Sequence, residues 1–134
     1  MRPWMLSIVL TSLAVTGCGN GLSTVSGRIT FNGEAVNRGA ITLIPKDGKG
    51  QAAGSSVENG SYSIKDVTPG EKTVQIYAVY PMGTKKEADG TEIELVGDLL
   101  PSSWGPTSQN TMTVTGPRTT KDFPIEGPDP RTTK

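Results

Sequence analysis

Regular alternation of apolar and polar residues is the feature that most limits how this chain can fold. From residue 24 onward, one set of alternate positions holds Val25, Gly27, Ile29 and Phe31, with polar residues between them. A period of two puts every second side chain on one face, as in a half-buried β-strand. The pair Asn32-Gly33 follows directly and predicts a hairpin turn, because both residues tolerate positive φ. The folded part of the chain therefore starts as β-structure.

Further strands are predicted along the chain, with turn residues between them. They cover residues 39–45, 51–57, 61–65, 72–80, 110–115 and 121–126. Residues 72–80 show the clearest alternation, whereas residues 51–57 are small and fit an edge strand. Asn59-Gly60 and Pro69-Gly70 mark turns, and no segment shows a helical period with capping residues. Seven short strands joined by turns predict an all-β fold of the β-sandwich class.

Two stretches do not fit this pattern of short strands. Residues 81–109 are long for a loop inside one domain, and only residues 92–96 within them predict a short accessory strand. Residues 127–134 are polar and rich in proline, so the sequence predicts a disordered tail there. The folded domain is expected to span residues 24–126, after a short tether of residues 18–23.

Residues 1–17 have the pattern of a signal peptide. Arg2 gives a positive start, and an uncharged apolar run follows over residues 4–15. This run is too short for a transmembrane helix of about 20 residues but fits a signal-peptide core of roughly 7–15 residues. It ends in Leu13-Ala14-Val15-Thr16-Gly17-Cys18, which resembles the bacterial lipobox. Cys18, the only cysteine in the chain, is therefore the predicted lipidation site.

The alternative to a lipid anchor is an ordinary secretory signal that happens to end near a cysteine. The position of the single cysteine favours the lipoprotein, because its thiol would be the nucleophile that takes up a diacylglyceryl group. Several acyl chains would hold the protein stably at the membrane. We expect a location in the cell envelope, facing the periplasm. Gly19, in place of an Asp after the cysteine, slightly favours the outer membrane.

Composition excludes several classes of function. The 13 basic residues are balanced by 13 acidic ones, which argues against a nucleic-acid partner. The chain has no histidine, so it lacks the commonest general base and metal ligand and cannot form a catalytic triad that contains histidine. We expect no enzyme activity, no cofactor and no metal site.

Several motifs resemble the carboxypeptidase regulatory-like domain. The similar segments are Val25-Ser26-Gly27-Arg28-Ile29, Asn32-Gly33-Glu34-Ala35-Val36, Gly39-Ala40-Ile41-Thr42-Leu43-Ile44-Pro45, Asn59-Gly60-Ser61-Tyr62-Ser63-Ile64 and Val67-Thr68-Pro69-Gly70-Glu71-Lys72-Thr73-Val74. Leu100-Pro101-Ser102-Ser103-Trp104 resembles an element of small planctomycete lipoproteins built on this domain. The resemblance covers residues 24–126 and implies a seven-stranded, prealbumin- or transthyretin-like (Ig-like) β-sandwich. The chain departs from the family pattern at Lys72, where an aromatic residue is usual, and at Trp104, where a Tyr is usual.

Trp104 is the main candidate for contact with a ligand. Exposed aromatic rings stack on sugars in carbohydrate-binding proteins, and the ring faces suit that contact. The competing interpretation, which we favour, is that Trp104 folds its loop back onto the core. Carbohydrate platforms usually present several exposed aromatic rings, and this chain has few aromatic residues.

The other polar candidates fit structural roles better. Glu92, Glu94 and Asp98, with Asp89 nearby, carry oxygen ligands that suit calcium, but their spacing matches no calcium loop and predicts a solvated acidic segment. The segment Asp47-Gly48-Lys49-Gly50 lacks the frame of a phosphate-binding loop and predicts a turn. The serine pairs have no histidine to act as a base, so no catalytic serine is expected. These pairs are Ser55-Ser56 and Ser102-Ser103.

Two functions remain open on the sequence. The first is a structural or protein-interaction module, tethered to the membrane through Cys18, whose partner is an unknown envelope protein. The second is a carbohydrate-binding module that uses Trp104 to contact a glycan. A third function, that of the transthyretin-related ureide hydrolases, requires histidines and a Tyr-Arg-Gly-Ser terminus that this sequence lacks.

Overall fold

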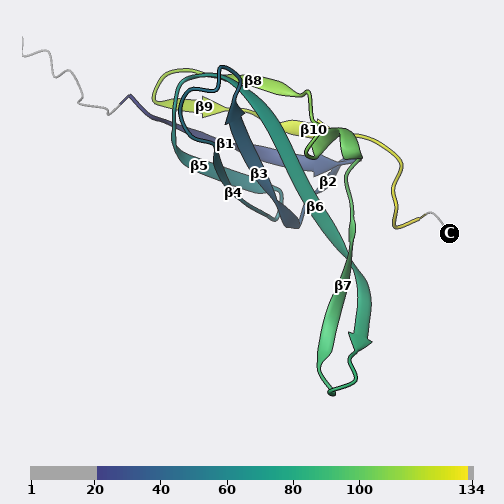
Figure 1. The fold of residues 1–134 in the computed structure, drawn as a ribbon. Helices are drawn as coiled ribbons and strands as arrows, with labels where there is room; N and C mark the ends of the chain where they lie inside the picture. The colour runs from purple at the N-terminus through teal and green to yellow at the C-terminus, as the bar shows by residue number, and fades with distance from the viewer. Residues whose placement is uncertain (1–20, 133–134) are drawn as a thin grey trace, which may run out of the picture.

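The computed structural model describes residues 21–132, and within them the chain is all-β apart from one short 3₁₀ turn (Figure 1). The first five strands are β1 (Ser23–Phe31), β2 (Glu34–Ala35), β3 (Arg38–Pro45), β4 (Ala53–Glu58) and β5 (Ser61–Val67). They are followed by β6 (Gly70–Lys86), β7 (Glu92–Asp98), the 3₁₀ turn η1 (Ser102–Trp104), β8 (Thr111–Val114), β9 (Arg118–Thr120) and β10 (Phe123–Ile125). The predicted all-β class is confirmed.

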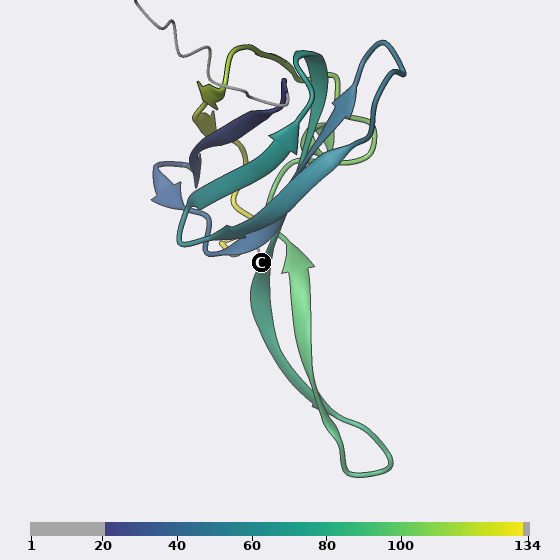
Figure 2. The same ribbon diagram turned by 90° about the vertical axis from the view of Figure 1, so that its left-hand side faces the viewer.

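The strands form one curled, mostly antiparallel sheet that closes around a core like a β-sandwich (Figure 2). Seven strands follow the hydrogen-bonded order β10-β1-β5-β4-β3-β6-β7. The remaining strands lie off this path, with β2 and β9 on β1 and β8 on β6. Both β9 and β10 run parallel to β1. The C-terminal strands therefore return to the first strand, which joins the two ends of the described chain.

Both predicted Asn-Gly turns are present. Asn32-Gly33 has φ values of 51° and 86°, and Asn59-Gly60 has φ values of 52° and 78°. Positive φ at both central residues is the geometry that matches the twist of paired strands. Each turn closes a pair of directly opposite residues, Phe31 with Glu34 and Glu58 with Ser61. These two dipeptides fix the register of the hairpins β1–β2 and β4–β5.

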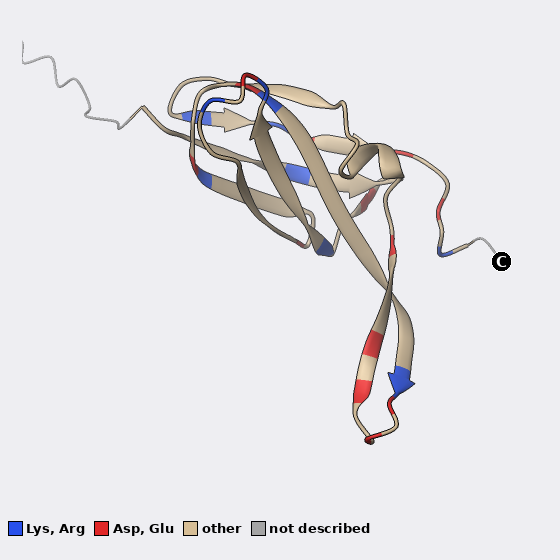
Figure 3. Cartoon of the chain, viewed as in Figure 1, with Lys and Arg blue, Asp and Glu red and all other residues tan. Residues whose placement is uncertain are grey.

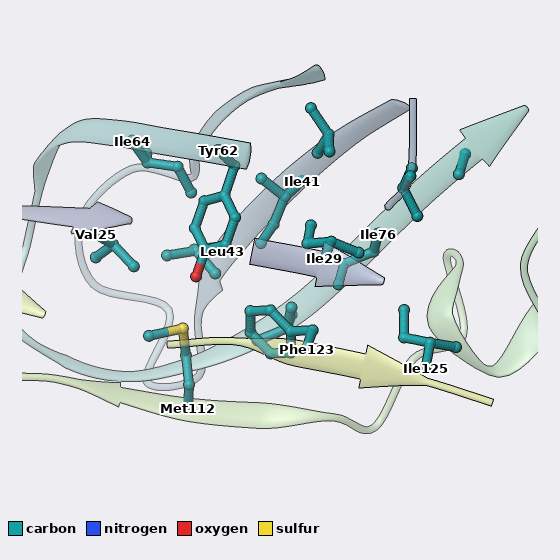
Figure 4. Packing of buried hydrophobic residues seen from close by; sticks show 14 of the residues in the cluster. Val25, Ile29, Ile41, Leu43, Tyr62, Ile64, Ile76, Met112, Phe123 and Ile125 are labelled. Atoms are coloured by element: carbon teal, nitrogen blue, oxygen red, sulfur yellow. The ribbon is translucent and has the colours of Figure 1, made fainter. Parts of the chain in front are cut away.

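The core consists of the apolar residues that the alternation assigns to one face of each strand (Figure 4). On β6, Val74, Ile76 and Ala78 are buried, as the period of two predicts. Phe123 and Ile125 are also buried, so the last strand, β10, contributes to the core. The other members include Val25, Ile29, Phe31, Ile41, Leu43, Val57, Tyr62, Ile64, Met112 and Val114.

Lys72 is buried within this region, with 2% of its surface exposed. Its Nζ donates a hydrogen bond to Oγ1 of Thr68 at 2.6 Å. A buried ammonium group requires such a partner, because its transfer out of water is costly. Lys72 thus lies on the same buried face of β6 as Val74 and Ile76.

Strand β4 covers most of the strand predicted for residues 51–57. It pairs along its length with β3, whereas on its other side only Glu58 pairs with β5, next to the Asn59-Gly60 turn. Its small residues have a packing reason, since a Cβ atom at Gly54 would lie 2.6 Å from the carbonyl oxygen of Ile41. Close approach of two backbones therefore requires a glycine at this position.

Strand β6 runs six residues past Tyr80, where the predicted strand ends, and pairs with β7 to form a long hairpin. The hairpin extends away from the body of the molecule (Figures 1 and 2). We call residues 81–98 the arm. Pro81 does not end the strand because it lies beside an irregularity in the β6–β7 register between Pro81 and Gly83, and a bulge is one of the positions where a sheet tolerates proline. The accessory strand predicted for residues 92–96 is confirmed and is two residues longer.

The prediction of a disordered tail after Glu126 is wrong for residues 127–132. The side-chain amide of Asn32 donates to the carbonyl of Gly127 at 2.9 Å and accepts from its N–H at 3.1 Å. Arg131 forms ion pairs with Glu34 at 2.9 Å and with Asp129 at 2.7 Å. The polar composition of the tail suggested disorder, but Gly127 and Arg131 are bound to Asn32 and Glu34 in the β1–β2 hairpin.

We expect Gly27→Ala to destabilise the fold. A Cβ at this position would clash with the carbonyl of Lys121, where the chain leaves β9 and approaches β1. Overpacking of this kind should cost about 2 kcal/mol in the free energy of unfolding, measured by urea denaturation. Ser26→Ala is the neighbouring control and should change stability by less than about 0.5 kcal/mol. Equal stability of the two variants would contradict the close approach of β1 to the C-terminal strands.

Candidate functional site

Cys18 and the predicted signal peptide lie outside the described residues. The lipid anchor therefore stays a prediction from sequence. Between residues 21 and 132, no helix has the length and apolar character that a membrane crossing would require.

Trp104 lies at the end of η1, half-buried against the core. Its ring meets the ring of Phe123 edge to face, with 5.9 Å between centroids and 79° between planes. Phe123 in turn lies 6.1 Å from the ring of Tyr62. Such edge-to-face contacts stabilise aromatic pairs beyond the area they bury. This contact agrees with the interpretation that Trp104 folds its loop back onto the core.

Hydrogen bonds hold the loop that carries Trp104 against β6. The Trp104 N–H donates to the carbonyl of Pro101 at 3.1 Å, which closes the 3₁₀ turn. Further along, the Ser108 hydroxyl donates to the carbonyl of Val74 at 2.6 Å and accepts from the N–H of Asn110. Ser108 is itself buried. This serine was not singled out from the sequence, because its partner is remote along the chain.

A hollow of about 660 Å³ lies between this loop and β6. Its lining includes Tyr77, Leu100, Pro101 and Pro106, with Asp98 as the charged group. Tyr77 is 54% exposed, whereas Trp104 does not line the hollow. An aromatic face available to a sugar would therefore come from Tyr77 and not from the predicted Trp104.

The acidic residues of the calcium hypothesis lie on the arm but do not converge. Glu94 is paired with Arg38 through two hydrogen bonds of 2.9 and 3.1 Å. This hydrogen bonding, with the charge of Arg38, lowers the pKa of the Glu94 carboxyl. Asp89 accepts the N–H of Thr91 at 2.9 Å, which also lowers its pKa. Within residues 21–132, no three His, Cys, Asp or Glu side chains gather closely enough to hold a metal ion.

The other polar candidates have local structural roles. The Asp47 carboxylate accepts the N–H of Lys49 at 2.8 Å, and Gly48 and Gly50 have positive φ. The turn predicted for residues 47–50 is thereby confirmed. Ser55 donates to the carbonyl of Ser56 within β4, and Ser102 and Ser103 belong to η1.

The arm exposes the large apolar side chains that the sequence did not single out. Met82 is 60% exposed, and Ile93 and Leu95 are each 39% exposed. Val96 is exposed to a similar degree. Soluble proteins seldom leave such residues together on the surface unless they contact a partner or a membrane. Their alternation along β7 was visible in the sequence, but the alternation did not show that this face would lack a cover.

The two faces of the arm differ in character. Side chains two residues apart share a face of a strand, so Ile93 and Leu95 lie on one face of β7. Glu92 and Glu94 lie on the other face, together with Asp98. Charge is concentrated on the arm, with acidic groups on β7 and at the tip and two lysines at the end of β6 (Figure 3).

The arm and the start of the described chain lie at opposite ends of the molecule. Strand β1 begins at the end away from the arm, and the tip of the β6–β7 hairpin is remote from it in both views (Figures 1 and 2).

No protein-family model and no curated protein matches this chain. Among solved structures, a "putative adhesin" from Bacteroides ovatus ATCC 8483 is similar over 84% of this chain and 49% of its own, with 15% identity and a TM-score of 0.45. The 9R-lipoxygenase from Cyanothece PCC8801 is similar over 79% of this chain and 16% of its own, with 9% identity and a TM-score of 0.34. This chain thus spans about half the length of the first protein and a small part of the second. Neither likeness assigns a function to this chain.

We expect Trp104→Ala to lower the stability of the protein. Loss of the half-buried ring and of its contact with Phe123 should cost about 2 kcal/mol in the free energy of unfolding, measured by urea denaturation. Tyr77→Ala removes an exposed aromatic ring and serves as the control, with little change expected. An unchanged unfolding midpoint for Trp104→Ala would show that the ring does not support the core.

Proposed function

We propose that this protein is a lipid-anchored, non-catalytic β-sandwich lipoprotein that acts as a protein-interaction module at the cell envelope, with the arm as its contact surface. We further propose that its body has the seven-stranded transthyretin-like arrangement that the sequence motifs imply. The observation that carries the functional proposal is the arm itself, which presents Met82, Ile93 and Leu95 to solvent outside the folded body.

The arm suits a docking role on physical grounds. Apolar side chains that remain in water gain free energy when a partner covers them, by about 25 cal/mol for each Å² of apolar surface. The Arg38–Glu94 ion pair joins the first residue of β3 to β7, although such an exposed pair contributes little to stability. We propose that this ion pair orients the arm relative to the body.

The proposed anchor agrees with this arrangement. Lipidation of Cys18 would attach the end of the molecule remote from the arm to the membrane. The tether expected over residues 18–23 is one residue shorter in this proposal, because Ser23 is the first residue of β1 and is buried. Its two glycines favour a flexible segment. The arm would then project into the periplasmic space, where an envelope protein can reach it. The sequence preference for the outer membrane rests on Gly19 alone.

The carbohydrate-binding alternative has less support. Its key residue, Trp104, has its ring against Phe123. The exposed aromatic residue near the hollow is Tyr77, and one exposed ring makes a small platform for a glycan. A glycan array in which binding depends on Trp104 would nevertheless reverse this preference.

The anchor predicts a defined modification at Cys18. Mass spectrometry of the protein from native membranes should show an N-terminal peptide that begins at Cys18 and carries acyl chains. Cys18→Ser removes the thiol nucleophile, so this peptide should lose its lipid or keep residues 1–17. Wild-type protein with an unmodified Cys18 would contradict the proposed anchor.

If the arm is the contact surface, a protein with a shortened arm should lose its contacts with the partner. Replacement of residues 82–95 by Asn-Gly would close the hairpin between Pro81 and Val96, which lie opposite each other, with a turn of the preferred type. Crosslinking in native membranes should then lose the products seen with the wild-type protein. Tyr77→Ala is the control, because it alters an exposed residue of the body, and its products should remain. Products that persist in a folded, arm-shortened protein would exclude the arm as the contact surface.

A further inference from the structure

Strand β7 has an open edge along the arm. It pairs with β6 on one side, and within residues 21–132 no other strand pairs with it. An open edge presents a row of unpaired N–H and C=O groups. Proteins use such edges to bind extended segments, with backbone hydrogen bonds supplying affinity and alternate side chains supplying specificity.

The side chains of β7 define what kind of segment fits beside it. A strand added to this edge would place alternate residues on the two faces of the arm. One set would lie beside Ile93 and Leu95, which are exposed and apolar. The other set would lie beside Glu92, Glu94 and Asp98, with Val96 between the last two. The edge therefore matches a segment in which apolar residues alternate with positive ones.

The negative charge of this face is only partly balanced within the described chain. Arg38 pairs with Glu94, and Lys86 lies directly opposite Glu92 across the hairpin, but no ion pair of residues 21–132 includes Glu92 or Asp98. Opposite charges directly across two strands stabilise pairing, whereas like charges oppose it. A positive side chain on the added segment would supply the counter-charge that Asp98 lacks, since Val79 lies opposite it, and another would lie beside Glu92 on the side away from Lys86.

A second copy of this chain fits the edge poorly. Antiparallel pairing of two β7 strands would bring Glu92 of one copy toward Asp98 of the other, and these like charges would repel. Contact between two arm faces is also small, because a two-stranded face of this length measures roughly 24 Å by 10 Å. A stable dimer interface buries about 800 Å² on each partner.

We propose that the open edge of β7 binds an extended segment of a partner protein in which apolar residues alternate with Lys or Arg. The segment adds a strand to the arm, its apolar residues lie beside Ile93 and Leu95, and its positive residues lie beside Glu92 and Asp98. This inference rests on the proposed function of the arm and specifies the chemistry of the partner.

The test measures binding of labelled peptides to the detergent-solubilised full chain by fluorescence anisotropy. The probe is a seven-residue peptide in which Val and Lys alternate. It should bind about tenfold more tightly than a peptide of the same composition with its Val residues grouped together. A peptide of alternating Val and Glu should not bind. N-methylation of alternate residues on the edge that faces β7 should abolish binding, because it removes the backbone donors and keeps the side chains.

Protein variants locate the site. Glu92→Lys/Asp98→Lys should weaken binding of the Val-Lys peptide about tenfold, and binding to the wild type should weaken as salt rises. Glu71→Lys/Glu126→Lys makes the same change in net charge away from the arm and should leave binding unchanged. Equal losses in the two double variants, or undiminished binding of the N-methylated peptide, would overturn the proposal in favour of non-specific charge attraction.

Two further outcomes separate this inference from the proposed function. If no alternating peptide binds, but shortening the arm still removes the native crosslinks, the arm is a contact surface and the inferred partner chemistry is wrong. If sedimentation shows a dimer that the arm-shortened variant cannot form, a second copy occupies the arm and the inference is also wrong. If the arm-shortened variant keeps both its crosslinks and its binding of the peptide, both proposals are contradicted.

Discussion

Strand β6 connects the two parts of the molecule, because one continuous backbone lies in both. Its first half pairs with β3 and β8 and buries Val74, Ile76 and Ala78. Its second half pairs with β7 alone. The same face that is covered in the body continues into the arm, where no second layer covers it. Exposure of the apolar arm residues is therefore a consequence of strand length and not of a separate binding loop.

The C-terminal strands and the Trp104 loop depend on a chain of aromatic contacts. Tyr62, Phe123 and Trp104 follow one another, with Phe123 in contact with both other rings. The Tyr62 hydroxyl donates to the carbonyl of Lys121, just before β10. Burial raises the pKa of this hydroxyl, and the nearby charge of Asp122 adds to the effect. Tyr62 thus remains a neutral donor and helps to fasten β10 to the core.

The charges of the molecule are used differently in its two parts. At the C-terminal end, Arg131 pairs with Asp129 and Glu34 and ties the tail to the β1–β2 turn. On the arm, Glu94 has a partner while Glu92 and Asp98 have no ion pair among the described residues. Paired charges fix the fold locally, whereas unpaired charges beside an open strand edge favour one kind of partner over another.

The amino-acid sequence by itself determined most of the strands, the two Asn-Gly turns and the buried face of the body strands, because these follow from local alternation and backbone preference. It did not indicate the short strands β2 and β9 or the second half of β6. It also contained the Cys18 motif, which is a chemical signal independent of the fold. Three features depended on partners distant in sequence. They are the close approach of Gly54 to Ile41, the bonds of the tail to Asn32 and the contact of Trp104 with Phe123. Only the tertiary structure decided that the arm projects from the body, because alternation along a strand assigns residues to a face but does not show whether another layer covers it.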